Sequence, residues 1–186
     1  MSQIVGRFGT GDGDQAPDDT EPEGNAPSPR ASRRFRRHLA SAVTAVTTVA
    51  DGGFRAAAVA AVTVVSVEPL QVLASVDADS RMCEWIGEAG CFGVSILPWR
   101  AQVLADRFAG NAPLASPSFA GIEYVTAVTG APLLGTAISW ADCKLVQSLE
   151  TGDHRCFIGE ALALGSGAGD PGDPLIYVLS RYGRLR

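Results

Sequence analysis

The sequence lacks the features that mark several large classes of protein. It has four cysteines, none in a C-x-x-C pair, and two isolated histidines, which is not the spacing of a zinc site. It shows no apolar signal segment at its start and no apolar run long enough to cross a bilayer. We therefore expect a cytoplasmic protein with no metal and no membrane association. In that compartment the cysteines are expected to be reduced, and disulfides are the alternative.

The chain also lacks an overall excess of positive charge, which argues against a nucleic-acid partner. Its formal net charge is −5, but six acidic residues and a single basic residue lie in residues 1–29. The remainder, with fourteen of each, is close to neutral. Residues 1–29 are rich in Gly and Pro and poor in large apolar side chains, so we expect a disordered acidic tail. Residues 30–186 are long enough to form a single domain with its own core.

A basic segment follows the tail. It contains Arg30, Arg33, Arg34, Arg36 and Arg37. The segment predicts a short helix that leads into the domain. It fits either a nucleic-acid patch or a solvated helix face that packs Phe35 and Leu39 against the domain. We favour the second interpretation, because runs of charge usually face solvent.

Most of the remaining chain has the β-branched, alternating pattern of strands. The expected strands are Ala42–Val49, Phe54–Val67, Val72–Val76, Phe92–Leu97, Ile122–Val128, Ala137–Glu150, Cys156–Leu164 and Leu175–Val178. Turns at Asp51-Gly52-Gly53 and Gly152-Asp153 predict hairpins. Two helices are expected, at Ser80–Ala89 and Trp99–Phe108. This order predicts a mainly β protein, a closed or nearly closed antiparallel barrel with helical insertions.

One corner of this predicted fold is suited to a phosphate group. Ser80 stands where a helix begins after an apolar strand, and Arg81 follows it. Free backbone N–H groups and the positive end of the helix dipole favour an anion at such a place. The alternative is a helix that the Ser80 hydroxyl merely caps.

The order of these pieces resembles the flavin reductase-like family, whose fold is the FMN-binding split barrel. The similarity runs from about Phe35 to Leu185. The matching pieces are FRRHLASAVTAVTTV, SVEPLQVLASVDADSR, FGVSILPWRAQVLADRFAG, GAPLLGTAISWADCKL, GDHRCFIGEALAL and PLIYVLSRYGRL. Members of this family typically serve as the small reductase component of two-component flavin monooxygenases.

The resemblance implies a flavin site along the segment before SVEPL, and this segment is unusually apolar here. An Asn and a Ser expected in the family fall on Ala60 and Ala61, and a further Ser falls on Val64, while Thr63 and Ser66 keep their hydroxyls. The remaining positions that the resemblance assigns to cofactor binding are Ser80, Arg81, Ser95, Tyr182 and Arg184. In the family a Thr follows at the position of Met82, and Ser95 replaces an Asn.

His154 matches a family histidine that lies near the nicotinamide of the reduced pyridine nucleotide. The resemblance therefore assigns it a catalytic role, and the alternative is a plain turn at Gly152-Asp153-His154. The implied function is an NADH- or NADPH-dependent flavin reductase that supplies reduced FMN or FAD to a partner monooxygenase. The resemblance also implies a homodimer, for which strands Ala42–Val49 and Ala137–Glu150 suit the contact.

The lost polar groups leave an alternative open. On the same scaffold, a protein without a working flavin site would bind or transform a hydrophobic biosynthetic intermediate, or act as an inactive partner subunit.

Overall fold

The computed structural model describes residues 26–110, 119–168 and 172–185, so the predicted tail lies almost wholly outside the described residues. The first half contains helix α1 (Pro29–Arg37), strands β1 (Ser41–Ala42), β2 (Thr44–Ala50), β3 (Gly53–Val59), β4 (Val62–Val67) and β5 (Leu70–Asp77), helix α2 (Met82–Ala89) and strand β6 (Cys91–Ile96). The second half contains the 3-10 turn η1 (Trp99–Ala101), helix α3 (Gln102–Phe108) and strands β7 (Tyr124–Thr126), β8 (Pro132–Leu134), β9 (Ser139–Thr151), β10 (His154–Gly165), β11 (Ile176–Val178) and β12 (Arg181–Gly183).

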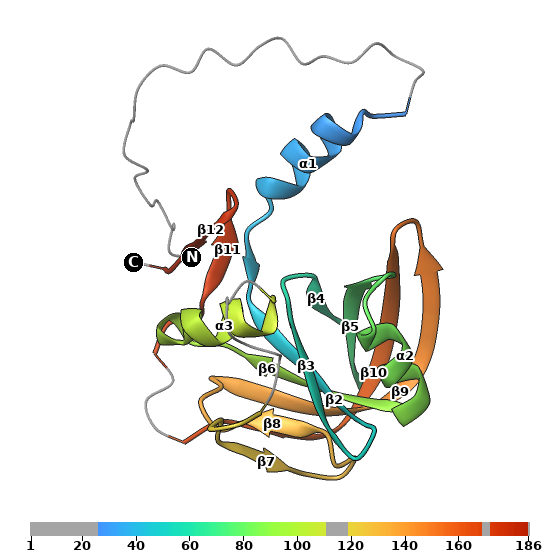
Figure 1. Cartoon of the computed structure of the whole chain (residues 1–186), viewed down its shortest axis with the longest axis vertical. Helices are drawn as coiled ribbons and strands as arrows, with labels where there is room; N and C mark the ends of the chain where they lie inside the picture. The colour runs from blue at the N-terminus through green and yellow to red at the C-terminus, as the bar shows by residue number, and fades with distance from the viewer. Residues whose placement is uncertain (1–25, 111–118, 169–171, 186) are drawn as a thin grey trace.

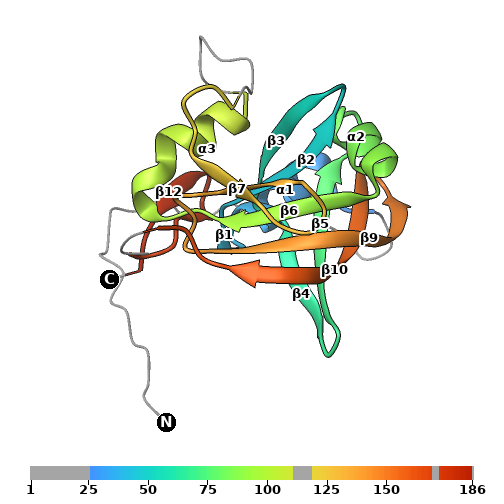
Figure 2. The ribbon, with the colours of Figure 1, turned by 90° about the horizontal axis from the view of Figure 1, so that it is seen from below.

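Seven strands form the main sheet, in the order β3-β2-β6-β9-β10-β5-β4, and neighbouring strands are antiparallel. The sheet curls into a barrel whose helices lie outside it (Figures 1 and 2). Strands β1, β11 and β12 form a separate small sheet. The predicted mainly β barrel is therefore confirmed.

Two hairpin turns come from residues with left-handed backbone. Asp51 and Gly52 have φ of 50° and 70° and join β2 to β3. Gly152 has φ of 59° in the turn between β9 and β10. Both turns lie where the Gly and Asp residues predicted them, because such residues adopt positive φ at low cost.

The expected single strand Phe54–Val67 is wrong. The strand is interrupted at Ala60 and Ala61, and we call this point the break. Strand β3, before the break, pairs with β2, whereas β4, after it, pairs with β5. The two halves thus lie at opposite edges of the sheet order. The break carries neither Gly nor Pro, so the sequence contains no turn signal there. Strands β8 and β12 were also not expected.

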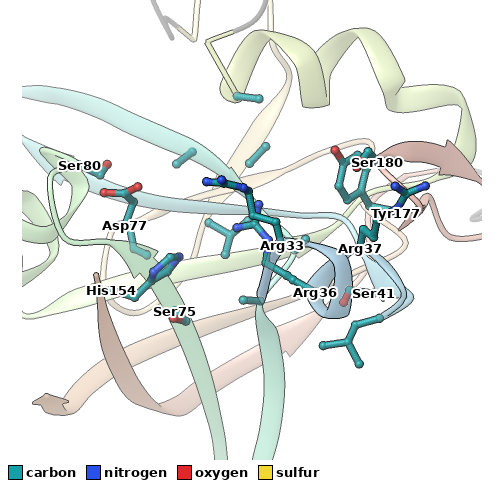
Figure 3. Close-up of a pocket in the computed structure, with 18 of the residues that line it drawn as sticks. Arg33, Arg36, Arg37, Ser41, Ser75, Asp77, Ser80, His154, Tyr177 and Ser180 are labelled. Atoms are coloured by element: carbon teal, nitrogen blue, oxygen red, sulfur yellow. The ribbon is translucent and has the colours of Figure 1, made fainter. Parts of the chain in front are cut away.

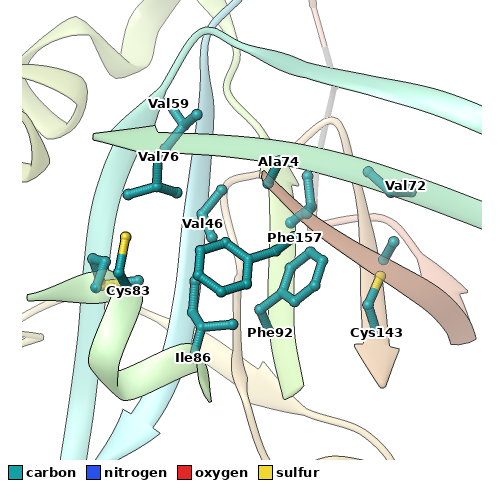
Figure 4. Close-up of a cluster of buried hydrophobic side chains, with 13 residues drawn as sticks. Val46, Val59, Val72, Ala74, Val76, Cys83, Ile86, Phe92, Cys143 and Phe157 are labelled. Atoms are coloured by element: carbon teal, nitrogen blue, oxygen red, sulfur yellow. The ribbon is translucent and has the colours of Figure 1, made fainter. Parts of the chain in front are cut away.

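The core consists of two clusters of buried side chains. One lies between α2 and the sheet, where Phe92 from β6 and Phe157 from β10 are almost completely buried (Figure 4). Gly159 makes this packing possible: a Cβ there would lie 2.6 Å from the Phe92 ring and 2.8 Å from the Cβ of Cys143. The second cluster packs α3 against β2 and β3 around Leu97, Phe108 and Leu134.

The two predicted helices are present and end near the predicted glycines. Gly90 caps α2 with φ of 63°, and Gly110 follows α3 with φ of 74°. None of the described helices is long and apolar enough to span a membrane. The four cysteines are all free thiols.

Helix α1 corrects the expectation for the basic segment. It forms where the arginines predict it, with the Ser28 hydroxyl accepting from the backbone N–H of Ala31, but it buries no side chain. Phe35 and Leu39 are 70% and 56% exposed, so they do not pack against the domain. In Figure 1 the helix projects from the barrel, beside the β11–β12 end.

Candidate active site

A cavity of about 1100 Å³ lies between α1, the end of β3, the end of β5 and the tip of the β9–β10 hairpin (Figure 3). Most of its lining comes from three groups of residues. They are the arginines of α1; residues 57–61 at the end of β3; and Ser75, Asp77, Ser80 and His154 at the hairpin side. Ser41, Phe108, Tyr177 and Ser180 complete the far side.

The wall formed by residues 57–61 is made of four alanines and Val59, and it ends at the break between β3 and β4. Backbone carbonyls hold it in place: the Thr44 hydroxyl donates to the carbonyl of Val59 at 2.7 Å, and the N–H of Ser75 donates to the carbonyl of Ala61 at 2.9 Å. These side chains are short and carry no polar group, so the wall is apolar. We call it the alanine wall.

His154 lies at the start of β10, directly opposite Asp77 in the pairing of β10 with β5. The N–H of Ala78 donates to the carbonyl of Asp153 at 3.0 Å, which ties the hairpin tip to the loop after β5. The Nδ1 of His154 is 2.7 Å from a carboxylate oxygen of Asp153. This hydrogen bond, together with the charge interaction with His154, lowers the pKa of Asp153. The contact leaves Nε2 as the ring nitrogen available to a ligand.

Ser80 lies in a tight loop that starts at Asp77. A carboxylate oxygen of Asp77 accepts from the N–H of Asp79 at 2.9 Å, and the Asp77 carbonyl accepts from the N–H of Ser80 at 3.0 Å. The Ser80 hydroxyl accepts from the N–H of Met82, the first residue of α2, at 3.3 Å, and Ser80 also lines the cavity. Most backbone N–H groups of this loop therefore have partners within the protein, and the group that this corner offers to an anion is the Ser80 hydroxyl.

Arg81 is not among the described residues that line the cavity. Its guanidinium lies over the ring of Trp85, 4.7 Å from the ring centre, and that of Arg55 lies 5.0 Å from the same ring centre. These contacts hold Arg81 against α2.

The structure does not bring the other predicted site residues to the cavity. Thr63 and Ser66 lie on β4, beyond the break. Ser95 is completely buried, and its hydroxyl accepts from the N–H of Leu134 at 3.1 Å. Tyr182 donates to Asp106 at 2.8 Å, and Arg184 lies over Trp99. The cavity thus gathers Ala60, Ala61, Ser80 and His154 from the predicted set.

The α1 arginines were missed as site residues. The signal in the sequence is their spacing, because positions 30, 33, 34 and 37 recur every three or four residues and share one helix face. The sequence could not show that this face points toward a cavity.

The residues of the cavity fit a flavin. The alanine wall offers an apolar surface against which a planar ring can pack, and Ser80 and the arginines offer donors for anionic groups. His154 lies on the same cavity, where it can contact a second ring.

Comparisons with known proteins agree with this geometry. The family model described as the flavin reductase like domain matches residues 35–186. The chain belongs to the flavin reductase family. The family match and the similar proteins described next confirm the family, the fold and the flavin reductase activity that the sequence predicts.

Relatives of this flavin reductase match it over most of their length. The FMN reductase (NADH) RutF of Ancylobacter novellus is 33% identical over 171 residues, which cover 90% of this chain and 93% of the relative. The reductase component of the 4-nitrophenol 4-monooxygenase/4-nitrocatechol 2-monooxygenase of Rhodococcus opacus is 33% identical over 164 residues, which cover 87% and 85%. The crystal structure of BorF, the flavin reductase component of a bacterial two-component tryptophan halogenase, has a TM-score of 0.76 at 31% identity, covering 85% of this chain and 98% of BorF. None of these likenesses favours the non-reductase alternative.

Proposed function

We propose that this chain oxidises NADH and reduces free FMN or FAD in the cavity beside α1, and that the reduced flavin leaves to serve a separate monooxygenase. The observation that carries the proposal is the cavity itself, which brings the alanine wall and His154 together in a chain of this family. Relatives named as reductase components of two-component monooxygenases support the partner.

When bound, the flavin supplies the chemistry, since its ring accepts a hydride from the reduced nicotinamide. The protein's task is to hold two planar rings in contact and to keep water from between them. The alanine wall supports one ring by packing. The Ser80 hydroxyl, which lines the cavity, donates to the charged end of the same molecule.

His154 orients the second ring. Its Nδ1 is engaged by Asp153, which fixes the imidazole plane and directs Nε2 toward the cavity. From this position Nε2 donates to or accepts from the carboxamide of the nicotinamide. The imidazole therefore positions the nicotinamide ring against the flavin ring, which packs on the alanine wall. It takes no proton in the hydride step.

Steady-state oxidation of NADH with FMN or FAD tests this proposal. We expect flavin-dependent oxidation, and we expect Ala61→Trp to reduce kcat/KM for the flavin at least tenfold, because Ala61 lines the cavity and an indole would fill it. Val103→Trp is the matched control, since Val103 is 82% exposed on α3 and does not line the cavity. An Ala61→Trp variant with wild-type activity refutes the proposed site. A wild type without flavin-dependent oxidation refutes the proposed function.

The chain is further proposed to be a cytoplasmic homodimer. The expected contact through Ala42–Val49 is wrong, because Val43–Thr48 are buried inside the protein. The second expected segment, Ala137–Glu150, does carry exposed apolar side chains, Val146 and Leu149 on β9. Others lie on β4, at the edge of the main sheet, and on β10: Val64, Val65, Val67, Leu162 and Leu164. Such an apolar edge suits a second copy of the chain. Light scattering should give twice the monomer mass for the wild type and the monomer mass for Val67→Asp.

A further inference from the structure

The cavity is far more positively charged than an apolar ring requires. The arginines at positions 30, 33, 34, 36 and 37 all line it, and Asp77 is the one carboxylate among the described lining residues. Helix α1 itself contains no acidic residue that would pair with them within the helix. Among them, Arg30, Arg33, Arg36 and Arg37 bring four guanidinium groups to one cavity, which form a binding surface for several negative charges.

The arrangement of α1 directs this charge across the cavity. Figure 3 shows Arg33 between the His154 and Asp77 side and the Tyr177 and Ser180 side. The carbonyl of Arg37 accepts from the N–H of Leu179 at 2.6 Å, which fixes the end of α1 to the β11–β12 turn. The pKa of Asp153 is lowered mainly by His154 and in part by the charge of Arg36, so Arg36 acts on the hairpin tip.

A partly exposed aromatic ring lies at the far end of the same surface. Tyr177 lines the cavity, is 40% exposed, and packs edge-to-face against Tyr182 with ring centres 5.8 Å apart. The packing holds the Tyr177 ring rigid while leaving part of it open to a ligand. Rigid exposed aromatic rings stack well on bases.

A single flavin phosphate does not account for these features together. The Ser80 corner already offers one phosphate site, on the opposite side of the cavity from Tyr177 (Figure 3). A cavity of about 1100 Å³ also exceeds the space that one flavin ring system fills. Two adjacent phosphates followed by a purine, the adenosine diphosphate group, match both the charge and the aromatic ring.

We propose that Arg33 and Arg37 of α1 bind the diphosphate of an adenosine diphosphate group and that Tyr177 stacks on its adenine. FAD and NADH both contain this group, so the assignment rests on the proposed function and makes it more specific. The arginine surface then acts as a specificity determinant that favours dinucleotide over mononucleotide forms of the substrate.

Calorimetric titration with ADP alone tests the site without turnover. We expect ADP to bind, AMP to bind more weakly, and Arg33→Gln/Arg37→Gln to weaken ADP binding by roughly tenfold for each arginine removed, since each loses a charge-assisted hydrogen bond. The control is Arg100→Gln/Lys144→Gln, which removes the same charge from exposed positions outside the cavity. Because α1 buries no side chain, the double variant should fold, which circular dichroism checks.

Kinetics with truncated substrates identify the molecule that carries the group. If it is FAD, the Arg33→Gln/Arg37→Gln variant raises KM for FAD and leaves KM for FMN unchanged. If it is NADH, the variant raises KM for NADH and leaves that for reduced nicotinamide mononucleotide unchanged. Unchanged ADP binding in the double variant, or equal losses for FMN and FAD, overturns the assignment. A wild type that binds ADP but oxidises no NADH refutes the reductase function and leaves the ADP site standing.

Discussion

Introducing two polar side chains on the alanine wall should strengthen flavin binding by an amount that follows from the usual free energy of a hydrogen bond. Ala60 and Ala61 lie at the break between β3 and β4 and both line the cavity. Ala60→Asn and Ala61→Ser, combined, add an amide and a hydroxyl that face the ligand. A hydrogen bond contributes about 0.5–1.5 kcal/mol net, so two bonds contribute about 1–3 kcal/mol and lower Kd by about 5- to 150-fold.

Fluorescence titration with FMN measures this change directly. The matched control is Val64→Ser, because the family pattern also expects a hydroxyl there, while the structure places Val64 on β4, 55% exposed and away from the cavity. We expect Val64→Ser to leave Kd unchanged. Equal Kd values for wild type and the double variant, or a gain from Val64→Ser, would refute the placement of the flavin on the alanine wall.

Three further predictions concern catalysis, packing and pH. His154→Gln should lower kcat/KM for NADH about tenfold with little change in flavin Kd, as expected for the loss of one orienting contact; equal losses in both would contradict the assigned role. Gly159→Ala should cost about 1–3 kcal/mol of unfolding free energy in urea, whereas Gly87→Ala on α2, whose Cβ would meet no atom within 4 Å, should not destabilise. Burial and the hydrogen bond to Asp106 raise the pKa of Tyr182 from 10.0 to about 12. The folded state therefore holds that proton more tightly, and stability should fall as pH rises from 10 toward 12; the fall should be smaller in Tyr182→Phe.

Much of the fold follows from local patterns in the sequence. The hairpins at Gly52 and Gly152 and the helix ends at Gly90 and Gly110 are predicted correctly because positive φ favours glycine. The break at Ala60 is not predicted from the sequence, because alanine fits either a continuing strand or a bend. Strand pairing decides between them, and pairing depends on residues far away in the sequence.

The site could be predicted only in part, for related reasons. His154 and Ser80 lie beside turns that the sequence indicates, and the structure places both at the cavity. Ser95 carries a hydroxyl at a family position, yet the pleat of β6 turns it into the core, where it meets a backbone N–H. A run of arginines has the pattern of a solvated helix, and only the position of α1 beside the hairpin tip gives it another role.

A crystal structure of the protein grown with FMN tests the central claim most directly. The account predicts electron density for the flavin ring against residues 57–61, with the phosphate at the Ser80 corner and with His154 facing the exposed side of the ring. Density for the flavin at another surface, with this cavity filled by protein side chains, would contradict the account.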